Sequence, residues 1–225
     1  MHRAEVLQVD DQGAQLGFAY SALSARGFFR EPTVDVLAPG TPPLLTWPFL
    51  DFIDHLDLKS SDLIELGAGN STLWFAERFG KVRSFETDPG FHSALASRVP
   101  GNVELELVPT EALESAEIAY RGEGWVLVDF AGKRTSFLRR FFEKVRRAEG
   151  PPAIVLDNAD WYRRGSAVLR EHGYLEIPFY GFKSGQLWIS CTSLFIDRER
   201  FSPVQKPGFF MPPFTRPMDN PWDCP

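Results

Sequence analysis

One stretch of the chain combines residue types that could bind a charged ligand. It reads Asp-Leu-Ile-Glu-Leu-Gly-Ala-Gly-Asn-Ser-Thr over residues 62–72. Its apolar start is typical of a short buried strand, and Gly67 and Gly69 allow a sharp turn and a close approach by a ligand. Ser71 and Thr72 can cap the amphipathic segment 73–79 as a helix. The N-terminus of that helix would offer free N–H groups and the positive end of its dipole to a carboxylate or a phosphate.

The sequence favours a zwitterion over a pyrophosphate as the ligand of this turn. A dinucleotide site wants Gly at three places, spaced G-x-G-x-x-G, and the third place here is Thr72. Glu65 stands two residues before Gly67, where it would repel a pyrophosphate and attract an ammonium group. S-adenosylmethionine carries a carboxylate and an ammonium at its amino-acid end, so it is the cofactor that fits best.

A second acid follows at the spacing expected of a ribose contact. Residues 81–86 read as a strand that ends in Glu86. An acid at the end of the second strand, about 20 residues past the glycine turn, typically hydrogen-bonds ribose hydroxyls. Nicotinamide and adenosyl cofactors both use this contact, so Glu86 alone does not choose between them.

Two later apolar strands also end in side chains that carry oxygen atoms. Residues 125–128 precede Asp129, and residues 153–156 precede Asp157 and Asn158. Ligands of an open parallel sheet bind outside the carboxyl ends of its strands. Oxygen atoms of this kind suit Mg²⁺, and a metal there could bind an oxygen acceptor and lower its pKa. The alternative is that the Asp-Asn pair forms only a turn with Asx hydrogen bonds and that Asp129 orients cofactor or substrate.

The elements that would position these groups alternate between strands and helices. Strands are expected at 62–66, 81–86, 103–108, 125–129 and 153–158, with helices at 47–58, 91–99, 135–149 and 161–172. Residues 174–179 and 187–196 would follow as two antiparallel strands, because only a short turn joins them. The pattern predicts an α/β fold of five parallel strands that ends in an antiparallel hairpin.

These features resemble the class I S-adenosylmethionine-dependent methyltransferases, over Thr46 to Ile196. The turn Gly-Asn-Ser-Thr-Leu-Trp and the strand end Leu-Asp-Asn also resemble uncharacterised bacterial methyltransferase-like proteins. The resemblance implies a Rossmann-like fold: a seven-stranded, mostly parallel sheet with an antiparallel last strand and helices on both faces. It also implies a set of cofactor-binding residues: Glu65, Gly67, Ala68, Gly69, Asn70, Ser71, Thr72, Glu86, Thr110 and Asp129.

The strand-end acids resemble those of cation-dependent, catechol-type O-methyltransferases. In that family an Asp ends strand four, an Asp-Asn pair ends strand five, and a Lys shortly after the first Asp acts as base. The resemblance implies Asp129, Asp157 and Asn158 as metal ligands, with Asp129 and Lys133 as catalytic residues. The family has its Lys one position earlier, where this chain has Gly132, so the chain departs from the pattern there.

Six aromatic residues could form a pocket for a methyl acceptor, although each is more often a core residue. Trp161 and Tyr162 directly follow the fifth strand and are the best placed; the others are Trp47, Phe130, Phe179 and Tyr180.

Length predicts one domain with an extension at each end. We expect an N-terminal extension over residues 1–60 that packs on the core, a methyltransferase domain over 61–200 and a proline-rich tail over 201–225. Residues 5–8 and 15–20 could pair as a hairpin within the extension.

Composition limits the partners and the compartment. A net charge of −6 argues against a nucleic-acid surface. No apolar run follows the first residues, and prolines interrupt the longest uncharged stretch, so neither a signal peptide nor a membrane span is expected. Cys191 and Cys224 match no zinc or redox spacing, which favours a reduced cytoplasmic protein with Cys191 in its core.

The function expected from the sequence is methyl transfer from S-adenosylmethionine to a small molecule, at oxygen. Two alternatives remain open at this point: a nicotinamide-dependent oxidoreductase, and a non-catalytic binding module that docks through its proline-rich tail. The identity of the acceptor and the formation of a homo-oligomer are not determined by the sequence.

Overall fold

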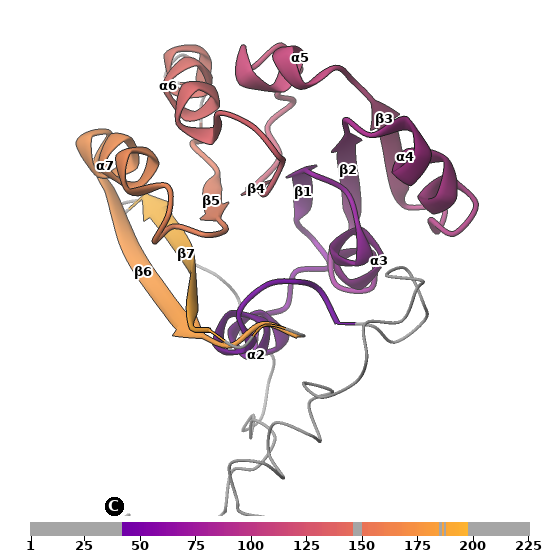
Figure 1. Ribbon diagram of the computed structural model, residues 1–225, viewed down its shortest axis with the longest axis horizontal. Helices are drawn as coiled ribbons and strands as arrows, with labels where there is room; N and C mark the ends of the chain where they lie inside the picture. The colour runs from indigo at the N-terminus through magenta and orange to yellow at the C-terminus, as the bar shows by residue number, and fades with distance from the viewer. Residues whose placement is uncertain (1–41, 146–149, 185, 187, 198–225) are drawn as a thin grey trace, which may run out of the picture.

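The computed structural model describes residues 42–145, 150–184, 186 and 188–197 (Figure 1). The expected N-terminal hairpin, the proline-rich tail and Cys224 lie outside these residues, so the division into three parts stays a prediction. The described helices and strands are α2 Trp47–Asp54, β1 Asp62–Leu66, α3 Asn70–Ala76, β2 Lys81–Glu86, α4 Pro89–Ala96, β3 Val103–Leu107, α5 Thr110–Glu114, β4 Trp125–Val128, α6 Arg134–Val145, β5 Ala153–Leu156, α7 Arg163–Glu171, β6 Tyr174–Gly181 and β7 Ser190–Asp197.

The strands form one seven-stranded sheet in the order β3-β2-β1-β4-β5-β7-β6. The first five strands pair in parallel, and β7 lies antiparallel between β5 and β6. This confirms the expected mixed sheet with an antiparallel last strand. A dinucleotide-binding sheet usually has the order 3-2-1-4-5-6, without an antiparallel strand inserted beside the fifth. The topology therefore argues against a nicotinamide-binding fold.

Helices cover both faces of the sheet, as expected. In Figure 1, α2 and α3 lie below the strands, and α5 and α6 lie above them. Successive residues of β1 point to opposite faces: Leu63 packs with the α2 and α3 side chains, whereas Ile64 packs with Phe137 and Phe141 of α6. Burial on both faces explains why the central strands are almost uniformly apolar. Cys191 is buried in the α6 core, as predicted.

Several boundaries differ from the sequence prediction. Residues 110–114 form helix α5, which is not among the helices expected from the sequence. Helix α7 begins at Arg163 rather than Trp161, because Asn158 takes a left-handed conformation and its carbonyl accepts hydrogen bonds from the two residues before the helix. Strand β7 begins at Ser190 rather than Leu187, and α2 ends at Asp54 rather than Leu58. None of the described helices is long and apolar enough to cross a membrane.

The turn after β1 lies directly against the end of β4. Gly67 has φ of +97°, and a Cβ atom placed there would lie 2.7 Å from the carbonyl oxygen of Asp129 and 2.9 Å from the amide nitrogen of Phe130. The Gly67 N–H donates to the Phe85 carbonyl at 2.9 Å, and the Asp129 N–H donates to the Leu66 carbonyl at 2.8 Å. Only glycine allows this close approach, which holds the ends of β1, β2 and β4 at one edge.

Replacing Gly67 should strongly destabilise the fold. Gly67→Ala adds a clash with backbone atoms and forces an L side chain into a left-handed conformation, so we expect a loss of about 2 to 4 kcal/mol in the free energy of unfolding. Urea titration measures this loss. Gly101→Ala is the matched control, because a Cβ atom there meets nothing within 4 Å. Equal stability of the two variants would contradict the close packing.

Candidate functional site

The fully buried carboxylate of Glu65 stabilises the turn after β1. The Gly69 N–H donates to Thr72 Oγ1 at 2.9 Å, and the Thr72 hydroxyl donates to Glu65 Oε2 at 2.6 Å. Ser84 of β2 donates to the same Glu65 oxygen. Glu65, on β1, therefore connects the start of α3 to β2, and both of its partners are uncharged.

The second oxygen of Glu65, Oε1, is buried and lacks a hydrogen-bond partner among the described residues. No described Lys or Arg forms an ion pair with Glu65. Burial raises the pKa of Glu65 to about 7, although the hydroxyl groups around it oppose the rise. An unpartnered buried acceptor is costly, and an incoming donor with positive charge would relieve that cost. The residues at this turn thus fit the ammonium end of S-adenosylmethionine.

The end of β2 presents the acid expected there. Glu86 is buried, and its Oε1 accepts the N–H groups of Thr87 at 2.6 Å and Asp88 at 2.8 Å. These two bonds fix the carboxylate at the strand end, while Oε2 makes no hydrogen bond to a described residue. The Val108 N–H donates to the Glu86 carbonyl at 2.9 Å, so the chain before Thr110 runs beside this acid. Thr110 itself is the first residue of α5 and is half-buried.

The end of β4 is held by an arginine that sequence reasoning missed. Arg134 is buried, and its Nη2 donates to Asp129 Oδ1 at 2.8 Å. Its Nε donates to the Phe130 carbonyl at 2.8 Å, its Nη1 donates to the Asp157 carbonyl at 2.8 Å, and its guanidinium lies over the Tyr162 ring. One side chain therefore connects the ends of β4 and β5. Burial and the nearby Asp157 carboxylate raise the pKa of Asp129, and Arg134 partly opposes this.

Lys133 lies apart from Asp129. Its side chain is 76% exposed, and its Nζ lies 3.3 Å from Glu114 Oε2 on α5. Its backbone N–H donates to Oε1 of the same glutamate at 2.9 Å. The next residue, Arg134, contacts Asp129 instead, so the geometry does not favour Lys133 as a base, and that role stays a prediction.

Asp157 and Asn158, two of the three residues expected to bind a metal, already have partners for their side-chain oxygen atoms. Asp157 is buried, with Oδ1 accepting from Thr192 Oγ1 at 2.7 Å and Oδ2 paired with the Lys183 ammonium. In the orientation that satisfies both ends of its amide, Asn158 donates to Asp157 and accepts from Lys183 at 3.1 Å. Across the described ranges, no group of three or more His, Cys, Asp or Glu residues could hold a metal ion. The residues present therefore do not fit the expected Mg²⁺.

The six aromatic residues do not come together as one pocket. Phe130 is buried in the α6 core, and Phe179 packs edge-on against Phe49 of α2. Tyr162 lies under the Arg134 guanidinium. Trp47 makes a tilted ring contact with Phe182. The most exposed aromatic residues near the strand ends are Trp161, Tyr180 and Trp188, with exposed fractions of 64%, 63% and 52%.

The raised pKa of Glu65 predicts a stability that falls with pH. Its pKa of about 7 in the folded chain exceeds the ordinary 4.5, so the folded chain binds more protons between these values and loses stability as pH rises through them. From pH 5.5 to pH 8 this loss is about 2 kcal/mol. Glu65→Gln cannot ionise, so urea titrations at the two pH values should show a loss smaller by that amount. Glu77→Gln, at an exposed site, is the control, and should match the wild type. If Glu65→Gln also matches the wild type, the pKa of Glu65 is not raised by burial.

The comparisons with known proteins concern the fold. No family model matches the sequence, and no curated protein matches it with significance. A precorrin-6y C5,15-methyltransferase from Geobacter metallireducens is similar in structure, with 17% identity, a TM-score of 0.51, and coverage of 66% of this chain and 88% of that chain.

Two structures that contain S-adenosylmethionine are also similar. The O-methyltransferase TomG from Streptomyces achromogenes, in complex with S-adenosylmethionine, has 17% identity, a TM-score of 0.50, and coverage of 86% of this chain and 92% of that chain. Fibrillarin from Aeropyrum pernix, with natively bound S-adenosylmethionine, has 13% identity, a TM-score of 0.51, and coverage of 66% and 72%. The chain thus has the fold of class I S-adenosylmethionine-dependent methyltransferases.

Proposed function

We propose that this protein transfers a methyl group from S-adenosylmethionine to an oxygen atom of a small molecule. The observation that carries the proposal is Glu65, whose Oε1 is buried under a glycine turn without a cationic or hydrogen-bonding partner among the described residues. The neighbouring strand end carries Glu86, because Leu66 of β1 pairs with Phe85 of β2. The class I fold supports the same assignment at the level of architecture.

Each part of the cofactor would have a group of this chain to hold it. The ammonium would lie toward Glu65, and the carboxylate would lie toward the backbone of the turn, over residues 68–71. Ribose hydroxyls would donate to Glu86 Oε2, and the adenine would lie toward Thr110. Asp129, at the end of the next strand, would face the sulfonium end.

The chain then has two tasks in the transfer. S-adenosylmethionine supplies a methyl group on a sulfonium that is already a good leaving group. The protein must hold the acceptor oxygen in line with that methyl group and exclude water. It must also remove the proton of the acceptor hydroxyl. We assign this second task to Asp129, because Arg134 fixes its Oδ1 while its Oδ2 makes no hydrogen bond to a described residue.

Cofactor binding is the first test. Calorimetry with S-adenosylhomocysteine should give a measurable heat of binding, and Glu86→Gln should weaken the affinity about tenfold, through the loss of a charge-assisted ribose hydrogen bond. Glu117→Gln, at an exposed site, should bind as the wild type does. No heat of binding to the folded wild-type protein would overturn the proposed function.

The proposed role of Asp129 as the base is tested by measuring methyl transfer. Asp129→Asn keeps an acceptor for Arg134 but cannot take a proton, so kcat should fall by about 100-fold or more. Affinity for S-adenosylhomocysteine should stay within about threefold, since this ligand lacks the sulfonium charge that Asp129 would face. Methyl release should be screened over phenols, sugars and amines to find the acceptor. Full turnover of a phenol or sugar by Asp129→Asn would remove Asp129 as the base.

A further inference from the structure

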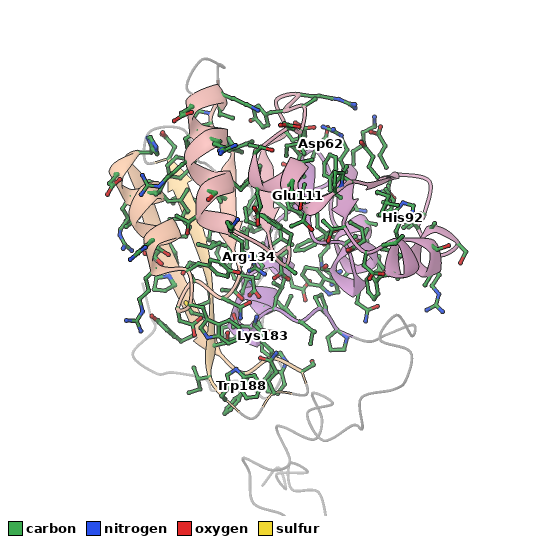
Figure 2. The ribbon with its side chains drawn as sticks, turned by 45° about the horizontal axis from the view of Figure 1, so that its top comes forward. Asp62, His92, Glu111, Arg134, Lys183 and Trp188 are labelled. Carbon is green, nitrogen blue, oxygen red and sulfur yellow. The ribbon has the colours of Figure 1, made fainter. Side chains whose placement is uncertain are left out.

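We propose that Lys183 is the resident cation of this site, occupying the place beside Asp157 and Asn158 that a divalent metal would need. Figure 2 labels Lys183 and Arg134, and both side chains bind Asp157 at the end of β5. The consequence for catalysis, transfer without a metal, rests on the proposed function; the occupancy itself does not.

Burial shows that the position of Lys183 is specific. Its side chain is only 2% exposed, although it lies in the connection between β6 and β7. Lysine is almost never fully buried unless it is paired. Here the ammonium contacts Asp157 Oδ2, and the satisfied orientation of Asn158 gives it a second oxygen at 3.1 Å. These are two of the three side chains that would have bound the metal.

The net charge of the cluster formed by Asp129, Asp157, Arg134 and Lys183 opposes the binding of a divalent cation. When both carboxyl groups are ionised, Asp129 and Asp157 contribute two negative charges, and Arg134 and Lys183 contribute two positive ones. A divalent ion added to this neutral group would bring two uncompensated charges into a buried site, which is strongly unfavourable. It would also have to displace Thr192 or Lys183 from the carboxylate oxygens of Asp157.

Lys183 also positions the acceptor side of the site. The Thr192 hydroxyl donates to Asp157 and accepts the Thr46 N–H at 3.1 Å, so one carboxylate connects β5, β7 and the residue before α2. Lys183 adds the β6–β7 connection to this junction. Trp188 belongs to the same connection, is half exposed, and is labelled below Lys183 in Figure 2. Lys183 thus acts as a positioning residue, as a bound metal would.

The test is to remove the ammonium and offer a metal in its place. In Lys183→Ala, Asp157 is left without its cation, and the removed side chain leaves space for Mg²⁺ or Ca²⁺ with waters. Protein freed of metal with a chelator is unfolded thermally in MgCl2 or CaCl2, against KCl of equal ionic strength. We expect the unfolding temperature of the variant to rise by about 3 to 6 °C at a metal concentration ten times its Kd. The wild type should not respond beyond the KCl control.

Two further variants test whether Lys183 occupies a cation site or serves only to stabilise the fold. Lys183→Arg keeps the positive charge and should remain insensitive to metal. Lys183→Ala combined with Asp157→Asn removes the ligand and should lose the response. A metal-dependent rise in the wild type would overturn the proposal, as would a Lys183→Ala protein that no metal stabilises or that fails to fold with metal present. These readouts are unfolding temperatures, so they hold even if no S-adenosylhomocysteine binding is found. Turnover of the wild type should survive a chelator.

Discussion

Two carboxylates lie close together where β4 and β5 end, and the structure depends on their neutralisation. A buried charge is tolerated only when a partner of opposite charge and hydrogen bonds compensate the loss of water. Arg134 compensates Asp129, and Lys183 compensates Asp157. Because these cations come from the start of α6 and from the β6–β7 connection, the same ion pairs fix both segments over the edge of the sheet. Neutralisation thus fixes how these two segments lie over the ends of β4 and β5.

The other half of the edge is not neutralised in this way. Glu65 meets only hydroxyl groups, and in the described part of the chain no Lys or Arg pairs with it. At this edge of the sheet, the acids at the ends of β4 and β5 are paired with cations of the chain, whereas the buried acid on β1, Glu65, has no cation beside it among the described residues. This asymmetry fits the proposed cofactor, whose ammonium would lie on the β1 side beside Glu65.

The sequence predicted the sheet because its signals are local. Apolar runs, glycine turns and strand-end acids identify β1, β2, β4 and β5, and the short connection before β7 requires an antiparallel pair. The partners of the acids were not predicted, because they depend on strand order. Lys183 lies 26 residues from Asp157, in a glycine-flanked turn that reads as exposed surface, and only the insertion of β7 beside β5 brings it to the carboxylate. Arg134 directly precedes the helix predicted at 135–149, and nothing local indicates that it pairs with Asp129. The sequence thus located the oxygen atoms at the strand ends but not the cations that pair with them.

The most direct measurement of the central claim is a crystal structure of the protein with S-adenosylhomocysteine. We predict the amino-acid end of the ligand over residues 67–72, its ammonium on the side of Glu65, and both ribose hydroxyls within hydrogen-bonding distance of Glu86. Lys183 should still pair with Asp157 in that complex. A ligand bound elsewhere, or a nucleoside turned so that its ribose misses Glu86, would contradict the proposed cofactor site.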